Sequence, residues 1–216
     1  SKTSADLLVQ EYGRYFNMYT ACFRGGCLTG ENHSGTQLHG FLSFLVKTII
    51  NKKKYSIIGY KGKQVRDNIH SFDVVTAFDN FIKKPKKGAN VYNLGGGREN
   101  SCSILEAIQK IENFSNIKCD YKILKTNRVG DHIWWITDNS KFKKDFPKWK
   151  ITKNLDDSLK NMIKSLPWKI LSKSPPIESR IEDCSLHQLG FDGFSCAETK
   201  FERIFLNTKK QRLIVS

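Results

Sequence analysis

Two arginines stand out from a lysine-rich sequence as residues that could do chemistry. Arg66 directly precedes Asp67 in "GKQVRDNIH", and Arg128 precedes Asp131 by three positions in "NRVGDH". A guanidinium offers paired N–H donors in a fixed geometry, which suits the oxygens of a diphosphate. Each arginine could equally form a local ion pair with its aspartate, and such a pair contributes little when exposed. The spacing alone leaves a diphosphate site and a structural ion pair both open.

Three consecutive glycines, Gly95–Gly97, follow a strand-like run in "VYNLGGGRENS". A dinucleotide-binding loop needs a third glycine where this sequence has Asn100, and a P-loop needs a Gly-Lys-Ser/Thr ending that is absent. No acidic residue ends a second strand about twenty residues further on. We therefore predict a tight turn from a strand to a helix, whose backbone N–H groups could still face an anion.

The cysteines predict no metal site. No two of them are separated by two residues, which excludes a zinc ribbon and a thioredoxin-like motif. Cys184, His187 and Cys196 are too sparse a set to predict zinc. We expect reduced thiols, mostly buried, as in other cytosolic proteins.

The composition is typical of a globular, cytoplasmic protein, with 39% hydrophobic and 26% charged residues and no apolar run long enough to span a membrane. The formal net charge of +15 could indicate a nucleic-acid-binding module or a lysine-rich, solvated surface. The lysine clusters belong to no nucleic-acid motif, which favours a solvated surface over nucleic acid as a partner.

Helical and strand-like patterns alternate along residues 1–166, which predicts an α/β fold. Helices are expected at 3–15, 38–50, 72–82, 138–146 and 155–166, and strands at 18–23, 90–94 and 118–124. Two short strands, 55–60 and 65–70, predict a hairpin. Ser103 and Glu106 have the spacing of a capping box. Residues 167–216 are predicted to be a linker and a tail of unrecognised type.

Several motifs, in order, carry a resemblance to a known family. "SIIGYKGKQVRDNIHSFDV", "VYNLGGGRENSCSILEA", "RVGDHIWWITDNSK" and "FPKWKITKNLDDSLKNMI" resemble signatures of the NAD-dependent nucleotide-sugar epimerases and dehydratases, which are extended short-chain dehydrogenases/reductases. The resemblance covers Ser1 to about Ile163. It implies the C-terminal part of a Rossmann-like fold with its substrate-binding subdomain. The form of "FRGGCLTGENHSGTQLHGFLSFLVK" is most similar to members that epimerise a CDP-sugar.

The resemblance implies roles in hydride chemistry on bound NAD. Lys2 matches the lysine of the family's Tyr-x-x-x-Lys catalytic pair, in which the lysine lowers the pKa of the tyrosine and contacts the cofactor. The backbone of Gly26 and Cys27 matches the segment that passes the nicotinamide.

The resemblance also implies a substrate site. Arg66 and Arg128 match positions that hold the nucleotide-sugar diphosphate, and Asp131 matches a residue beside them. His39 and Gly40 fall where the family's nucleotide-contacting helix begins. For His39, packing at the start of a helix is an equally open alternative.

The catalytic tyrosine and the cofactor loop of the family would precede Ser1, so we expect a C-terminal half that is inactive alone. Its partner would be a second copy of the chain or a missing N-terminal half. A basic nucleic-acid-binding module and a non-functional gene remnant remain the alternatives.

Overall fold

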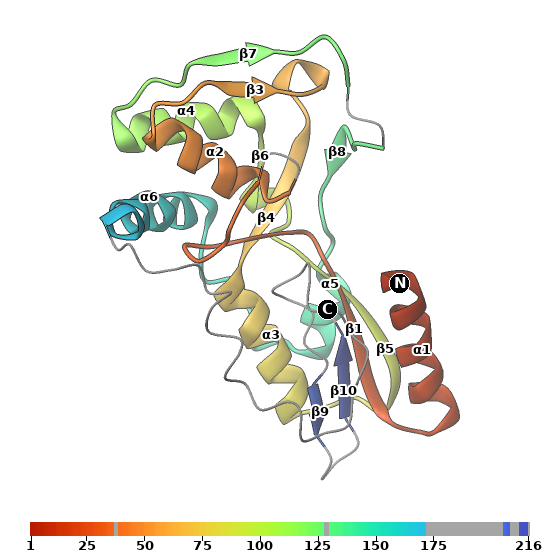
Figure 1. Cartoon of the computed structure of the whole chain (residues 1–216). Coiled ribbons are helices and arrows are strands. Elements are labelled where there is room, and N and C mark those ends of the chain that lie inside the picture. The colour runs from red at the N-terminus through yellow and green to blue at the C-terminus, as the bar shows by residue number, and fades with distance from the viewer. Residues whose placement is uncertain (37–38, 128–129, 172–204, 208–211, 216) are drawn as a thin grey trace.

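The computed structural model describes residues 1–36, 39–127, 130–171, 205–207 and 212–215, which form two lobes (Figure 1). Each lobe has its own hydrophobic core. Arg128, Cys184, His187 and Cys196 lie outside the described residues. None of the described helices is long and apolar enough to cross a membrane.

The first lobe is built on a four-stranded sheet with the order β5-β1-β10-β9. β1 is parallel to both of its neighbours, and β9 is antiparallel to β10. The strands are β1 (Tyr19–Gly25), β5 (Gly88–Leu94), β9 (Phe205–Asn207) and β10 (Arg212–Val215). The helices of this lobe are α1 (Lys2–Tyr15), α3 (Ser71–Lys83) and α5 (Ser140–Asp145).

Strand β1 is buried on both faces, which is typical of a parallel strand covered by helices. Thr20 and Cys22 face α1, where the Cys22 thiol donates a hydrogen bond to the carbonyl of Asp6. Ala21 and Phe23 face the opposite core, which α3 and α5 complete. The aromatic rings packed in that core include Phe23, Phe78, Phe81, Tyr92, Phe142, Phe146 and Trp149.

The second lobe packs three helices against a two-stranded parallel sheet (Figure 1). Its elements are α2 (Phe41–Ile50), α4 (Ile104–Ser115), α6 (Leu155–Leu171), β3 (Tyr55–Ile57) and β7 (Tyr121–Ile123). The largest fully buried side chains of this core include Leu45, Ile49, Ile57, Ile111 and Leu159.

Strand β4 (Val65–His70) runs between the two lobes and ends at α3 (Figure 1). It pairs with β2 (Cys27–Thr29), β6 (Ser101–Ser103) and β8 (Trp134–Trp135). Two short 3-10 helices, η1 (Tyr60–Gly62) and η2 (Arg98–Asn100), precede β4 and β6.

The predicted hairpin of residues 55–70 is wrong. β3 pairs with β7 in parallel, while β4 pairs with β2, β6 and β8. The turn between β3 and β4 contains η1, and Tyr60 and Lys61 there have positive φ angles. β3 and β4 therefore belong to different sheets, although their sequence has the pattern of a hairpin.

The remaining expectations on elements hold with shifted ends. The capping box is confirmed, since Glu106 N–H donates to Ser103 Oγ at 3.2 Å and Ser103 N–H donates to Glu106 Oε2 at 2.7 Å. α2 begins at Phe41 because Gly40 is its N-cap in the left-handed conformation. α6 continues beyond Leu166 to Leu171.

Candidate functional site

Asp67 is the buried centre of the candidate site, with no exposed surface. Its Oδ2 accepts hydrogen bonds from the backbone N–H groups of Gly97 at 3.0 Å and Thr137 at 3.1 Å. The glycine loop therefore does face an anion, and that anion is a carboxylate of the protein itself. A turn follows β5 as predicted, but it leads into η2 and then strand β6 before α4 begins, and not directly into that helix.

Two glycines allow the backbone to approach this carboxylate. A Cβ on Gly95 would collide with Asp67 Oδ2 and with Thr137 Oγ1. A Cβ on Gly26 would lie 2.9 Å from Asp67 Oδ1 and 3.1 Å from Thr137 Oγ1. Gly26 N–H also donates to the carbonyl of Leu94 at 2.9 Å, so the ends of β1 and β5 are held around Asp67.

Arg66 pairs with Asp131, not with its neighbour Asp67. Arg66 Nη2 lies 2.6 Å from Asp131 Oδ1, and the two side chains are only 14% and 19% exposed. Arg66 Nη1 donates to the carbonyl of Val65, and the hydroxyl of Tyr60 donates to the carbonyl of Asp131. Two residues predicted for the substrate site, Arg66 and Asp131, are therefore in contact across 65 residues, while Arg128 lies outside the described residues. The local ion pair of Arg66 with Asp67 that the sequence left open is not formed.

Cys27 joins the same cluster through β2. It is paired in register with Asn68 of β4, next to Asp67. Burial, and then the negative charge of Asp67, raise the pKa of the Cys27 thiol to about 11. The raised pKa favours the protonated thiol near neutral pH, and a thiol is a weaker nucleophile than a thiolate.

His39 and Gly40 lie at the start of α2. Gly40 has φ of 70°, and a side chain there would collide with the ring of His33. The rings of His33 and His39 are arranged edge to face, with their centroids 6.2 Å apart. Burial, and then the neighbouring His39, lower the pKa of His33, which sequence reasoning did not single out.

Lys2 is the first residue of α1 and is exposed. The structure thus distributes the predicted residues over three places: the start of α1, the start of α2, and the cluster around Asp67. In the sequence, Asp67 is distinguished only by its position next to Arg66. Its burial and its amide donors depend on contacts with residues 97 and 137, which no local pattern reveals.

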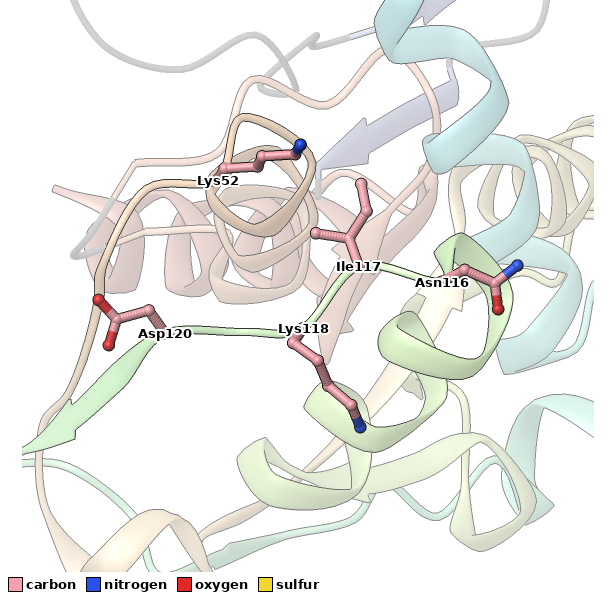
Figure 2. Close-up of a pocket in the computed structure, with 5 residues that line it drawn as sticks. All are labelled: Lys52, Asn116, Ile117, Lys118 and Asp120. Carbon is pink, nitrogen blue, oxygen red and sulfur yellow. The ribbon is translucent and has the colours of Figure 1, made fainter.

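Figure 2 shows an open pocket away from these residues, lined by Lys52, Asn116, Ile117, Lys118 and Asp120. Two of its three charged side chains form surface ion pairs, Lys118 with Glu112 and Asp120 with Lys54. None of the predicted site residues lines it. Among the described residues there is no group of three or more His, Cys, Asp or Glu placed to hold a metal ion.

Residues 1–95 match the NAD dependent epimerase/dehydratase family. The chain is similar to CDP-paratose 2-epimerase of Salmonella typhi, with 29% identity over 141 residues, or 62% of this chain and 41% of that protein. The chain therefore spans less than half the length of this curated relative.

Solved structures share the fold. The UDP-glucose 4-epimerase of Thermotoga maritima, solved with UDP-glucose, has a TM-score of 0.67 at 20% identity, covering 78% of this chain and 52% of that one. The UDP-glucuronic acid 4-epimerase of Bacillus cereus, solved with UDP-glucuronic acid and NAD, has a TM-score of 0.67 at 24% identity, covering 78% and 51%. Residues 1–95 thus match the NAD dependent epimerase/dehydratase family, as the quoted motifs predicted, and the described residues share the Rossmann-like α/β fold of solved nucleotide-sugar epimerases.

Proposed function

We propose that this chain is the substrate-binding part of an NAD-dependent nucleotide-sugar epimerase that acts on a CDP-sugar. The family match over residues 1–95 and the similarity to CDP-paratose 2-epimerase support this proposal. We propose that residues 1–166 form the part of the chain that corresponds to the enzyme. The observation that carries the proposal is the position of Arg66, whose guanidinium is fixed but not fully covered.

Arg66 is suited to a diphosphate because it is held in place with donors to spare. A guanidinium has five N–H donors. Arg66 is fixed by one bond from Nη1 to the carbonyl of Val65 and one from Nη2 to Asp131. The remaining donors are available to phosphate oxygens without loss of this anchoring. Arg128 is proposed as the second arginine of the clamp, and His39 and Gly40 as nucleotide contacts at the start of α2.

The carboxyl ends of β1 and β5 are the proposed place of the nicotinamide. In open α/β sheets, ligands bind beyond the carboxyl ends of parallel strands. Gly26 and Cys27 follow the end of β1 directly, are partly exposed, and are held against Asp67. Because Gly26 has no side chain, its backbone could lie close to the nicotinamide ring.

NAD, when bound, would accept a hydride from a sugar carbon and return it to the opposite face. Lys2 would place its positive charge beside a tyrosine phenol and lower that phenol's pKa, so that the tyrosine acts as base and then as acid. We propose that residues 1–216, which span less than half the length of the curated relative, bind substrate without turning it over.

The partner is proposed to be a second copy of the chain or an N-terminal half supplied separately. α1 exposes an apolar surface formed by Leu7, Leu8, Tyr12, Tyr15 and Phe16, each between 46% and 81% exposed. Exposed apolar residues gathered on one helix are typical of an interaction surface.

Calorimetric titration with CDP-glucose, with CDP and with cytidine tests the substrate class. We expect both diphosphates to bind and cytidine to bind far more weakly, because the diphosphate supplies the contact with Arg66. Equal or absent binding of all three ligands, with an N-terminal half added or not, would remove the substrate assignment.

A further inference from the structure

The turn that precedes β4 holds four consecutive residues in the left-handed region of backbone conformation. Their φ angles are 84° for Gly59, 47° for Tyr60, 54° for Lys61 and 77° for Gly62. Glycine adopts such angles freely, whereas a residue with a side chain is strained there. Tyr60 therefore stands at a position that favours glycine, and strain of this kind persists only where surrounding contacts hold the residue in place.

The turn is fixed to the core of the second lobe. A Cβ on Gly62 would lie 3.0 Å from a side-chain carbon of Leu105 and 3.4 Å from one of Ile57, so the backbone itself packs on that core. Gln64 Nε2 donates a hydrogen bond of 2.9 Å to the carbonyl of Ile58, which closes the turn at its base. The turn is therefore a firm support for the groups that project from it.

Two groups of Tyr60 reach from this turn to the segment that carries Asp131. The backbone N–H donates to Asn127 Oδ1 at 3.2 Å, and the phenol hydroxyl donates to the carbonyl of Asp131 at 3.3 Å. A glycine at position 60 could supply the first contact but not the second. The side chain of Tyr60 thus connects Asp131 to the fixed turn.

Asp131 in turn holds the guanidinium of Arg66. Beyond Asp131, the chain is tied to β4 by the pairing of β8 with that strand. Asp131 Oδ1 accepts hydrogen bonds from Arg66 Nη2 at 2.6 Å and from the N–H of His132 at 3.1 Å. The direction of this carboxylate, and with it the position of Arg66, depends on the backbone at Asp131, which Tyr60 contacts directly.

We propose that Tyr60 is a positioning residue for the diphosphate site: from a strained turn fixed to the second lobe, it holds Asp131, and Asp131 holds the guanidinium of Arg66. The inference rests on the proposed function for the identity of the ligand. Tyr60 acts through Asp131 and does not itself contact the diphosphate. Loss of its hydroxyl leaves the pair of Arg66 and Asp131 in place but less ordered.

NMR of isotopically labelled arginine side chains tests the positioning without any ligand. Tyr60→Phe removes the hydroxyl and keeps the ring, and Tyr121→Phe is the matched control on an exposed tyrosine of β7. Rotation about the Cζ–Nε bond of Arg66, whose signal disappears in Arg66→Gln, should become several-fold faster in Tyr60→Phe and stay unchanged in Tyr121→Phe. An unchanged rotation rate in Tyr60→Phe would overturn the proposal.

Titration with CDP measures the consequence for binding. Loss of one hydrogen bond that orders Arg66 should weaken CDP binding by about three- to tenfold in Tyr60→Phe. In the Arg66→Gln background, the same substitution should cause no further loss, because the group that Tyr60 positions is absent. A purely structural role would lower the affinity by the same factor in both backgrounds, and that result would contradict the inference.

Two glycine variants separate backbone strain from positioning. Lys61→Gly relieves a strained φ angle at a residue whose side chain is exposed, so it should bind CDP as the parent does. Tyr60→Gly relieves the neighbouring strain but removes the hydroxyl, so it should bind CDP as weakly as Tyr60→Phe does. Parent-like affinity in Tyr60→Gly would show that the hydroxyl does not act on the site.

The two proposals fail separately. If Arg66→Gln weakens CDP binding but Tyr60→Phe changes neither the rotation of Arg66 nor the affinity, only the role of Tyr60 is wrong. If Tyr60→Phe speeds the rotation of Arg66 while CDP affinity is the same in the parent, Tyr60→Phe and Arg66→Gln, the diphosphate assignment is wrong and Tyr60 still positions Arg66.

Discussion

The backbone N–H of Gly97 donates a hydrogen bond of 3.0 Å to the buried carboxylate of Asp67, thirty residues earlier in the chain. This contact gives the glycine loop a role that differs from cofactor binding. Through this hydrogen bond, the glycine loop at the end of β5 contacts Asp67 of β4. Arg66, the proposed diphosphate contact, is the preceding residue of the same strand. We expect this internal contact to help hold the strand that carries Arg66.

Asp67→Ala should lower the free energy of unfolding substantially. The substitution leaves the partly buried N–H groups of Gly97 and Thr137 without their acceptor, which should cost roughly 1–3 kcal/mol. Urea denaturation followed by circular dichroism measures this change. Asp79→Ala is the matched control, because Asp79 pairs with Lys83 on an exposed helix surface and should contribute little. Similar losses in the two variants would show that Asp67 does not hold the loop.

Gly95→Ala should destabilise the protein where Gly25→Ala does not. A Cβ on Gly95 collides with Asp67 and Thr137, whereas the nearest atom to a Cβ on Gly25 is a Leu28 side-chain carbon at 3.7 Å. Overpacking at Gly95 should cost roughly 1–3 kcal/mol. Thermal unfolding of both variants, compared with the parent, checks this difference. A Gly95→Ala protein as stable as Gly25→Ala would contradict the close packing around Asp67.

The stability of the protein should fall between about pH 7 and pH 5, partly through His33. Burial, and then His39, lower the pKa of His33 in the folded protein below its ordinary value of 6.5. As the pH falls through that value, the unfolded chain takes up a proton that the folded chain resists, so this contribution to stability is lost. Denaturation curves at several pH values should show a smaller fall for His33→Asn. His39→Asn should remove a lesser part, because burial remains. An unchanged slope in His33→Asn would contradict this assignment.

Much of the fold can be predicted from the sequence because it is encoded locally. Ser103 and Glu106 predict the start of α4, Asn154 accepts the N–H of Asp157 at the start of α6, and the glycine loop lacks the third glycine of a cofactor site. These features depend on residues a few positions apart, so their spacing is visible in the sequence.

Strand pairing and the centre of the site could not be predicted in the same way. Residues 55–70 have the pattern of a hairpin, yet β3 pairs with β7 at Tyr55↔Tyr121, far along the chain. Arg66 stands next to Asp67 in sequence but pairs with Asp131, because neighbouring residues of a strand point to opposite faces. Strand pairing and the partner of Arg66 depend on tertiary packing, so local sequence patterns cannot predict them.

Titration of CDP into two arginine variants tests the central claim most directly. Arg66→Gln removes the guanidinium at the proposed diphosphate site, and Arg14→Gln removes one that pairs with Glu11 on the surface of α1. Hydrogen bonds to charged groups are worth about 1.5–3 kcal/mol, so Arg66→Gln should weaken CDP binding by about ten- to a hundredfold. Arg14→Gln should bind CDP as the parent does, and both variants should unfold cooperatively. Equal CDP affinity in the parent, Arg66→Gln and Arg14→Gln would contradict the claim that Arg66 binds the diphosphate.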